Sequence, residues 1–299
     1  MATDIDWAED VWNPTTGCDR VSEGCDNCYA LTMARRLRLM ERERIGQGKL
    51  KPAQAKYQND GNPKTSGPGF LATQHPLALY PPLRSRKARR WFVNSMSDLF
   101  HKNITDRFIA AVFAVMAATP HHTYQLLTKR PRRMRVLLNS AQFWHLVRDE
   151  IKSLPVRENV RTAALAATHE PLPNLWLGVS VENQRWAENR IPELLRTPAA
   201  IRWLSCEPLI GRLDLSAWLV RNGGLHWVVL GGESGAGAKP MQLEWALEVQ
   251  EQSAAAGVAY YFKQPGRVLA AEWGINGKGN DPAQWPRPFP REFPEAVAA

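Results

Sequence analysis

The sequence VWNPTTGCDRVSEGCDNCYALTMARR, residues 11–36, combines a short apolar run, a loop with three cysteines and the start of a helical pattern. Val11 and Trp12 are typical of a strand, and the Asn-Pro and Gly residues that follow end it. From Tyr29 onward, apolar side chains recur at helical spacing. The cysteines therefore lie in the loop between a predicted first strand and a predicted first helix.

Cys18, Cys25 and Cys28 form a C-x6-C-x2-C cluster in this loop. Three thiols in one loop indicate a metal site, because thiolates are ligands of zinc and of iron–sulfur clusters. A closed structural zinc site takes four protein ligands, usually from two paired motifs, and no second C-x2-C occurs in the sequence. Two hypotheses follow. One is a three-cysteine site with an open coordination position, and the other is a zinc site completed by Cys206 or by a histidine such as His101.

Six further apolar runs follow along the chain, and each ends in polar, charged or glycine residues. They are WFVNSMSD, TYQLLTKRP, LWLGVSVEN, IRWLSCEP, HWVVLGGESG and VAYYFKQPG. Helical patterns occur between several of them, at residues 106–118, 132–154, 184–195 and 243–256. This alternation predicts parallel βαβ units, and strands that are apolar throughout are buried on both faces. The predicted fold is α/β, a full or partial (β/α) TIM-type barrel, with a doubly wound open sheet as the alternative.

The predicted barrel domain covers residues 1–265. It includes a long polar and basic insertion at residues 41–90, which we expect on the surface, and residues 266–299 form a C-terminal arm that contains Pro and Trp. With 299 residues, of which 44% are hydrophobic, the chain can bury a full core. No stretch approaches the roughly 18 apolar residues of a membrane span, and few, clustered cysteines fit a reducing compartment. We therefore expect a cytoplasmic protein with no membrane partner.

The three-cysteine loop, with Tyr29 beside its last cysteine, resembles that of the radical S-adenosylmethionine (radical SAM) enzymes. Their usual spacing is C-x3-C-x2-C, so the first gap here is longer. The segments WNPTTGC, CDNCYA, NSMSDLFH, LTKRP, LGVSVEN, SCEPL, GGESGAGA and FKQPG together resemble a phage- and prophage-associated family of unknown function that is grouped with radical SAM-type barrels. This resemblance extends over about residues 12–266.

The resemblance implies that Cys18, Cys25 and Cys28 hold a [4Fe-4S] cluster whose fourth iron has no protein ligand. In radical SAM enzymes, S-adenosyl-L-methionine binds that iron, and its reductive cleavage gives a 5′-deoxyadenosyl radical. The protein supplies orientation and exclusion of water. An electron donor such as flavodoxin or ferredoxin is expected as a partner.

Polar residues at the carboxyl ends of the predicted strands are the expected site residues, because parallel barrels place their active sites there. Ser95, Ser97 and Asp98 stand where the wider superfamily has a Gly-Gly-Glu run, and the resemblance predicts that they contact the cofactor's amino group. Others are predicted to bind the rest of the cofactor: Tyr29, Ser180, Glu182 and Asn183 (the last three at the ribose), and Gly231 and Gly232 as a backbone cradle. A simple tight turn at these glycines is the alternative.

Four residues are the predicted catalytic groups: Cys206, Glu207, Lys129 and Glu233. A thiol at a barrel mouth can donate hydrogen or act as a nucleophile, although a free cysteine is also often a small buried packing residue. Lys129 and Lys263 are expected to pair with the acids or to bind phosphate. Glu233 is expected to face the mouth.

The net charge of +9 favours a polyanionic partner, although a solvated basic surface is the plain alternative. The predicted nucleic-acid contacts are Arg84, Arg86, Lys87, Arg89, Arg90, Arg130, Arg132 and Arg133. Three functions remain open: a radical SAM enzyme that modifies or repairs a base in DNA or RNA, a non-catalytic zinc protein that binds nucleic acid, and a radical SAM enzyme acting on a small molecule or peptide.

Overall fold

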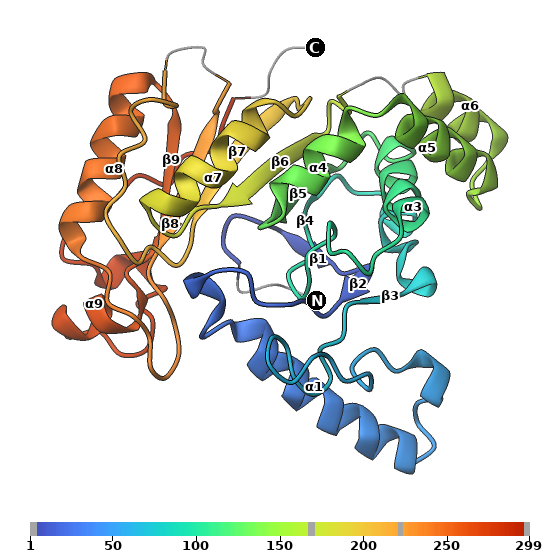
Figure 1. Cartoon of the computed structure of the whole chain (residues 1–299), viewed down its shortest axis with the longest axis horizontal. Helices are drawn as coiled ribbons and strands as arrows, with labels where there is room; N and C mark the ends of the chain where they lie inside the picture. Colours follow the sequence, from blue (N-terminus) through green and yellow to red (C-terminus); the bar gives the residue numbers. More distant parts are fainter. Residues whose placement is uncertain (1–4, 167–170, 221–223, 296–299) are drawn as a thin grey trace. The chain divides into compact units, whose positions relative to one another are not determined.

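The computed structural model describes residues 5–166, 171–220 and 224–295, and the chain divides into two compact units, Met1–Leu175 and Trp176–Ala299. Parallel strands and helices make up both units (Figure 1). The predicted α/β class is therefore confirmed, and all seven predicted strands are present. None of the helices within the described ranges is both long and apolar enough to cross a membrane.

The first unit is built on three parallel strands that pair in the order β1 (Asp10–Trp12), β4 (Arg90–Val93) and β5 (Thr123–Thr128). Helix α3 (Asp106–Ala117) connects β4 to β5 and is buried along nearly its whole length. The hydroxyl of Thr105 accepts a hydrogen bond from the backbone N–H of Phe108 and caps this helix. The helix predicted at residues 106–118 is confirmed.

The single helix predicted at residues 132–154 is instead two helices, α4 (Pro131–Leu138) and α5 (Ala141–Ser153). Asn139 ends the first, and the hydroxyl of Ser140 caps the second by accepting from the N–H of Phe143. Such a side-chain cap offers the backbone a local alternative to a continuous helix. A further helix, α6 (Glu158–Ala166), follows.

The second unit is built on four parallel strands in the order β6 (Leu175–Ser180), β7 (Ile201–Cys206), β8 (Trp227–Gly231) and β9 (Ala259–Gln264). Three helices accompany them: α7 (Gln184–Leu195), α8 (Leu243–Ala256) and α9 (Gly266–Glu272). Within each unit the strands lie in chain order without a reversal. A doubly wound sheet reverses its strand order, so the order is that of a partial barrel.

The insertion predicted at residues 41–90 is more ordered than a surface loop. Helix α1 (Tyr29–Gly46) extends into it, and short elements follow, namely η2 (Pro52–Gln54), β3 (Thr73–Gln74), η3 (Pro76–Ala78) and α2 (Pro81–Arg84). Strand β3 pairs antiparallel with β2 (Thr15–Thr16), directly before the cysteine loop. The insertion was expected on the surface, but the side chains of Tyr57, Phe70 and Leu79 within it are buried.

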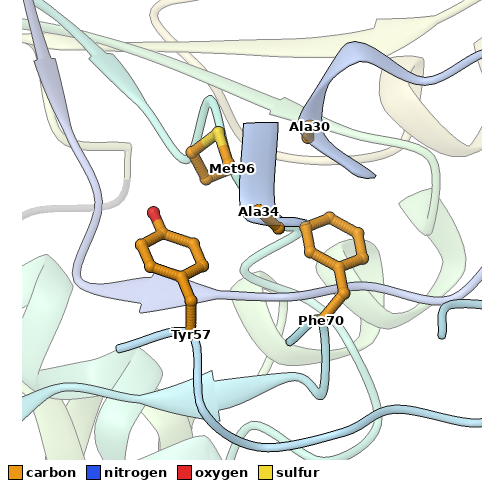
Figure 2. Packing of buried hydrophobic residues seen from close by; sticks show 5 residues of the cluster. All are labelled: Ala30, Ala34, Tyr57, Phe70 and Met96. Carbon is orange, nitrogen blue, oxygen red and sulfur yellow. The ribbon is translucent and has the colours of Figure 1, made fainter. Parts of the chain in front are cut away.

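Figure 2 shows where those side chains go. Tyr57 and Phe70 of the insertion point toward Ala34 of α1 and, with Ala30 and Met96, form a buried cluster. Two of the three loop cysteines, Cys18 and Cys28, pack against this cluster. The insertion thus supplies apolar side chains against which the cysteine loop packs.

The C-terminal arm, residues 266–299, packs on the strands of the second unit. Phe289 stacks on Phe262 of β9 with ring centroids 4.2 Å apart, and the indole N–H of Trp227 in β8 donates to the carbonyl of Glu292 at 2.8 Å. The arm also contains η4 (Pro282–Gln284). Residues 1–4 and 296–299, at the outer ends of the two predicted regions, lie outside the described residues.

Truncation of the insertion's core residue is predicted to destabilise the first unit. Phe70→Ala removes a ring that is 3% exposed, and the expected loss in free energy of unfolding is about 3–5 kcal/mol. The matched control is Leu77→Ala in the same insertion, whose side chain is 78% exposed, with an expected change within about 0.5 kcal/mol. Urea denaturation of the two variants checks this, and equal midpoints would contradict a packed insertion.

Candidate functional site

The cysteine loop begins after β2 and is fixed by backbone hydrogen bonds. The N–H of Cys18 donates to the carbonyl of Phe70 at 3.3 Å, and the N–H of Arg20 donates to that of Thr65 at 3.0 Å. Gly17 has φ +82°, and a Cβ there would lie 2.1 Å from the carbonyl oxygen of Leu71. Only glycine fits this close approach, so the loop is held tightly against the insertion.

Arg130 joins the carboxyl ends of all three strands in the first unit. Its Nη1 donates to Sγ of Cys18 at 3.2 Å and to Oδ2 of Asp98 at 3.0 Å, and its Nη2 donates to the carbonyl of Asp19 at 3.0 Å. These partners follow β1 and β4, and Arg130 itself follows β5. The guanidinium, predicted as a nucleic-acid contact, instead makes internal contacts beside the first cysteine.

The three thiols of the loop share one electrostatic neighbourhood but differ in acidity. Burial raises the pKa of Cys18 to about 12, against the opposing effect of Arg130. Burial likewise raises the pKa of Cys28. At Cys25 burial also disfavours the thiolate, but the charge of Lys129 and hydrogen bonds from Val21 and Ser22 outweigh it, so the pKa is lowered. Cys25 is therefore the most acidic of the three.

The thiols are not drawn together around a common point. Among the residues that the structure describes, no three Cys, His, Asp or Glu side chains are arranged as a ready set of metal ligands. Sγ of Cys18 contacts the carbonyl of Asp19 at 3.5 Å, and Sγ of Cys25 lies 3.7 Å from Oγ of Ser22. Binding of iron or zinc therefore requires these side chains to turn from their present partners.

The residues considered as a fourth zinc ligand are engaged elsewhere. Nε2 of His101 lies 2.9 Å from Oδ2 of Asp19. Cys206, the remaining cysteine of the sequence, is fully buried in β7. Neither residue is arranged as a ligand in this structure.

Ser95, Ser97 and Asp98, which were predicted to bind the cofactor's amino group, form hydrogen bonds within the protein. Oγ of Ser95 is bonded to the side chain of Asn13 at 3.0 Å, and Oγ of Ser97 lies 2.7 Å from that of Thr15. Asp98 accepts from the hydroxyl of Thr128 at 2.8 Å and from three other donors, which are the backbone N–H groups of Phe100 and Lys129 and the guanidinium of Arg130. The hydroxyl of Tyr29 donates to the carbonyl of Ser95 at 2.5 Å. These residues shape the loop after β4.

Asn94, directly before Ser95, was not among the site residues predicted from the sequence. It is 4% exposed and has φ +69°, a left-handed conformation that is uncommon outside glycine although asparagine tolerates it. Both polar atoms of its carboxamide are buried without a hydrogen-bond partner. The sequence signal was weak, since it consisted only of an asparagine at the end of an apolar run.

The predicted ribose contacts in the second unit also serve the fold. Glu182 is fully buried and pairs with Arg190 at 2.9 Å, and Arg190 also donates to the carbonyl of Ser180 and lies over the ring of Trp186. The side chain of Asn183 caps α7. All three residues lie at the carboxyl end of β6, where the side chains of Glu182 and Asn183 have partners within the protein. Their contact with the ribose stays a prediction.

Glu207 and Lys263 form the polar pair that was expected between an acid and a lysine. Their charged atoms lie 2.7 Å apart at the carboxyl ends of β7 and β9, and both side chains are partly exposed. Oγ of Ser205 donates to Glu207 at 3.4 Å. A Cβ at Gly231 would lie 3.2 Å from Oε1 of Glu207, so the glycine leaves room for the pair.

The glycine-rich segment after β8 is not an open cradle. A Cβ on Gly232 would lie 2.1 Å from the carbonyl oxygen of Pro265, so the space beside it is filled by backbone. Glu233 is 5% exposed, and its Oε2 accepts from the N–H of Lys239 at 2.7 Å. Gly235 has φ +93°. The segment is therefore a turn, in which the carboxylate of Glu233 is buried and bonded to the N–H of Lys239.

The environment of Cys206 is that of a buried packing residue. The residue is completely buried, and burial together with the nearby charges of Glu207 and Glu182 raises the pKa of its thiol. A protonated thiol surrounded by protein is a poor nucleophile. This burial argues against the nucleophilic role, and hydrogen donation by the thiol stays a prediction.

The basic cluster before β4 lies at the amino edge of the first unit's strands, away from the cysteine loop. Nη1 of Arg89 lies 3.5 Å from Oδ2 of Asp10 at the start of β1, and the N–H of Arg90 donates to Glu9. Amino ends of parallel strands share one edge. The residues predicted there as nucleic-acid contacts, Arg84, Arg86, Lys87, Arg89 and Arg90, therefore lie at the edge opposite the cysteine loop.

The two other arginines predicted after β5 differ from each other. Arg133 donates to the carbonyl of Ile104 at 2.6 Å and pairs with Asp106 at 2.6 Å. Arg132 is exposed. Only Arg132 of this pair projects into solvent at the cysteine edge.

Residues 2–285 match a family described as "Protein of unknown function (DUF5131)". The comparisons with curated proteins and with solved structures found no match.

The order of thiol acidity predicts an order of alkylation in metal-free protein. Because its pKa is lowered, Cys25 carries more thiolate near neutral pH than Cys18 or Cys28, and iodoacetamide should modify it first. Lys129→Met removes the nearby charge and should slow this step, whereas Lys102→Met, at an exposed lysine of the same unit, should not. Peptide mass spectrometry over time measures the order, and first modification of Cys18 would contradict the described environment.

The buried ion pair of the second unit predicts a stability effect. Glu182→Gln leaves Arg190 buried with no charge partner at that position, and the expected loss is about 3 kcal/mol or more in free energy of unfolding. Glu188→Gln on the exposed face of α7 is the control, with an expected change within about 0.5 kcal/mol. If Glu182→Gln matched this control in thermal denaturation, the structural role would be refuted.

Proposed function

We propose that this chain, which belongs to the DUF5131 family of proteins of unknown function, is a radical SAM-type iron–sulfur enzyme that modifies or repairs a base in DNA or RNA. The proposal includes a (β/α) partial barrel of the radical SAM kind. Its main support is the donor set in one clamped loop, where Cys18, Cys25 and Cys28 interact electrostatically beside two cations.

The donor set fits a three-cysteine cluster better than a closed zinc site. Three thiolates are the ligands that a [4Fe-4S] cluster needs when one iron is left for another molecule. The two residues considered as a fourth zinc ligand, His101 and Cys206, are respectively bonded to Asp19 and fully buried. When bound, the cluster would pass an electron to S-adenosyl-L-methionine, whose C5′–S bond then breaks to give methionine and a 5′-deoxyadenosyl radical.

The chain's own residues hold and polarise this site. Lys129 stabilises negative charge on Cys25 and Cys28, and Arg130 orients Cys18 through its hydrogen bond to Sγ. Hydrogen bonds and charges near cluster sulfurs are among the factors that set the reduction potential of an iron–sulfur protein.

Nucleic acid remains the proposed substrate, but through residues other than the cluster before β4. Helix α1 begins beside Cys28, and its Arg35 and Arg36 are exposed, as is Arg132 after β5. The ring of Tyr29 is 52% exposed in the same unit. Exposed arginines with an aromatic ring suit a single strand or an extruded base, which stacks on the ring while phosphates contact the cations. Flavodoxin or ferredoxin is the proposed electron donor.

Anaerobic reconstitution with iron and sulfide tests this function. The wild-type protein should become brown, contain about four iron and four sulfide per chain, and release 5′-deoxyadenosine from S-adenosyl-L-methionine on reduction with dithionite. Cys18→Ala, Cys25→Ala and Cys28→Ala should each abolish the product, since each removes one of three ligands.

The matched control is Cys206→Ala, which removes a cysteine outside the loop and should keep both the cluster and the product. A colourless protein that binds one zinc under the same conditions would favour the non-catalytic zinc hypothesis. Loss of the cluster in Cys206→Ala would show that the ligand set is wrong.

A further inference from the structure

Asn94 combines two unfavourable features at one position. It follows β4 directly, and its backbone N–H donates to the carbonyl of Trp12 at the end of β1. Its φ of +69° is left-handed, and both carboxamide atoms are buried without a hydrogen-bond partner. Each feature costs free energy in a folded protein, so the residue destabilises the fold that contains it.

Within the carboxamide of Asn94 both polar atoms lack a partner, whereas the side chains that follow it in the loop are bonded. The next side chains in the loop are Ser95, Ser97 and Asp98, and each has hydrogen-bond partners within the protein. The amide of Asn13, at the end of the neighbouring strand, is also bonded, to Ser95 and to the N–H of Met96. The carboxamide of Asn94 is therefore unbonded beside loop side chains that are bonded.

We infer that the carboxamide of Asn94 binds a nucleobase by its edge. A carboxamide presents a donor and an acceptor side by side, and asparagine pairs in this way with the exocyclic amine and ring nitrogen of adenine. An acceptor alone, such as a phosphate, would leave the amide oxygen unpaired. A molecule that carries an adjacent donor and acceptor satisfies both atoms. Because protein atoms cover the carboxamide in this structure, entry of such a molecule requires neighbouring side chains to move aside.

The position within the first unit supports this ligand. Ser95, the next residue, accepts a hydrogen bond from the hydroxyl of Tyr29, which is adjacent in sequence to Cys28. Asn94 is thus tied to the cysteine loop through one residue. The inference rests on the proposed function, which supplies two molecules that carry such a base. One is S-adenosyl-L-methionine, through its adenine, and the other is the nucleic-acid substrate.

Binding measurements on Asn94→Gly test the inference. Glycine adopts positive φ without strain, so this variant should fold with an unchanged or raised Tm while losing the carboxamide. We expect binding weakened by about tenfold or more for at least one of two probes. These are S-adenosylhomocysteine, followed by calorimetry, and a fluorescein-labelled single-stranded DNA of mixed sequence, followed by anisotropy. Loss for the first alone identifies the cofactor's adenine, and loss for the second alone identifies a substrate base.

Two further variants sharpen the test. Asn94→Asp keeps the shape but replaces the N–H donor with an acceptor, and it should bind as weakly as Asn94→Gly. Asn103→Gly, at an exposed asparagine of the same unit, should bind like wild type. The inference is overturned if Asn94→Gly binds both probes as wild type does, if wild type binds neither, or if Asn94→Gly lowers the Tm by several degrees. Each variant is compared with wild type at the same measured iron content, and release of 5′-deoxyadenosine tests the proposed function separately.

Discussion

The hydrogen bonds of Arg130 are the interaction on which the proposed site depends. One guanidinium contacts Cys18, Asp19 and Asp98, and it thereby fixes the segments that follow β1, β4 and β5 relative to one another. The salt bridge to Asp98 is largely shielded from water, with side-chain exposures of 16% and 7%, so it is only weakly screened. A loop with three cysteines has few regular hydrogen bonds of its own, and this network gives it a defined position.

The insertion supports the same loop from the opposite direction. Phe70 contributes its ring to the buried cluster (Figure 2). Cys18 and Cys28 pack against this cluster, and the carbonyl of Phe70 accepts a hydrogen bond from the backbone N–H of Cys18. Gly17 allows the close approach that this contact needs. Polar contacts on one side and apolar packing on the other limit the movement of the loop backbone.

Local signals in the sequence predicted the elements well, whereas partners distant in the chain decided the roles of polar residues. The helix at residues 184–195 and the cap at Thr105 depend on neighbours three or four residues away. By contrast, Asp98 receives its guanidinium from Arg130, 32 residues later, and no local pattern shows that pairing. The amino-edge position of Arg89 was readable in principle, because residues that precede a strand cannot lie at its carboxyl end. Asn94 was not readable, since only its three-dimensional surroundings show an unpartnered amide.

The account's central claim is that the loop cysteines bind iron and leave one iron open to S-adenosyl-L-methionine. Electron paramagnetic resonance of the reduced, reconstituted protein tests this most directly, because the spectrum of a cluster changes when a new ligand binds to its iron. The account predicts a changed spectrum on addition of S-adenosyl-L-methionine. A cluster spectrum that stays the same at saturating S-adenosyl-L-methionine, or a reduced protein with no cluster signal, would contradict it.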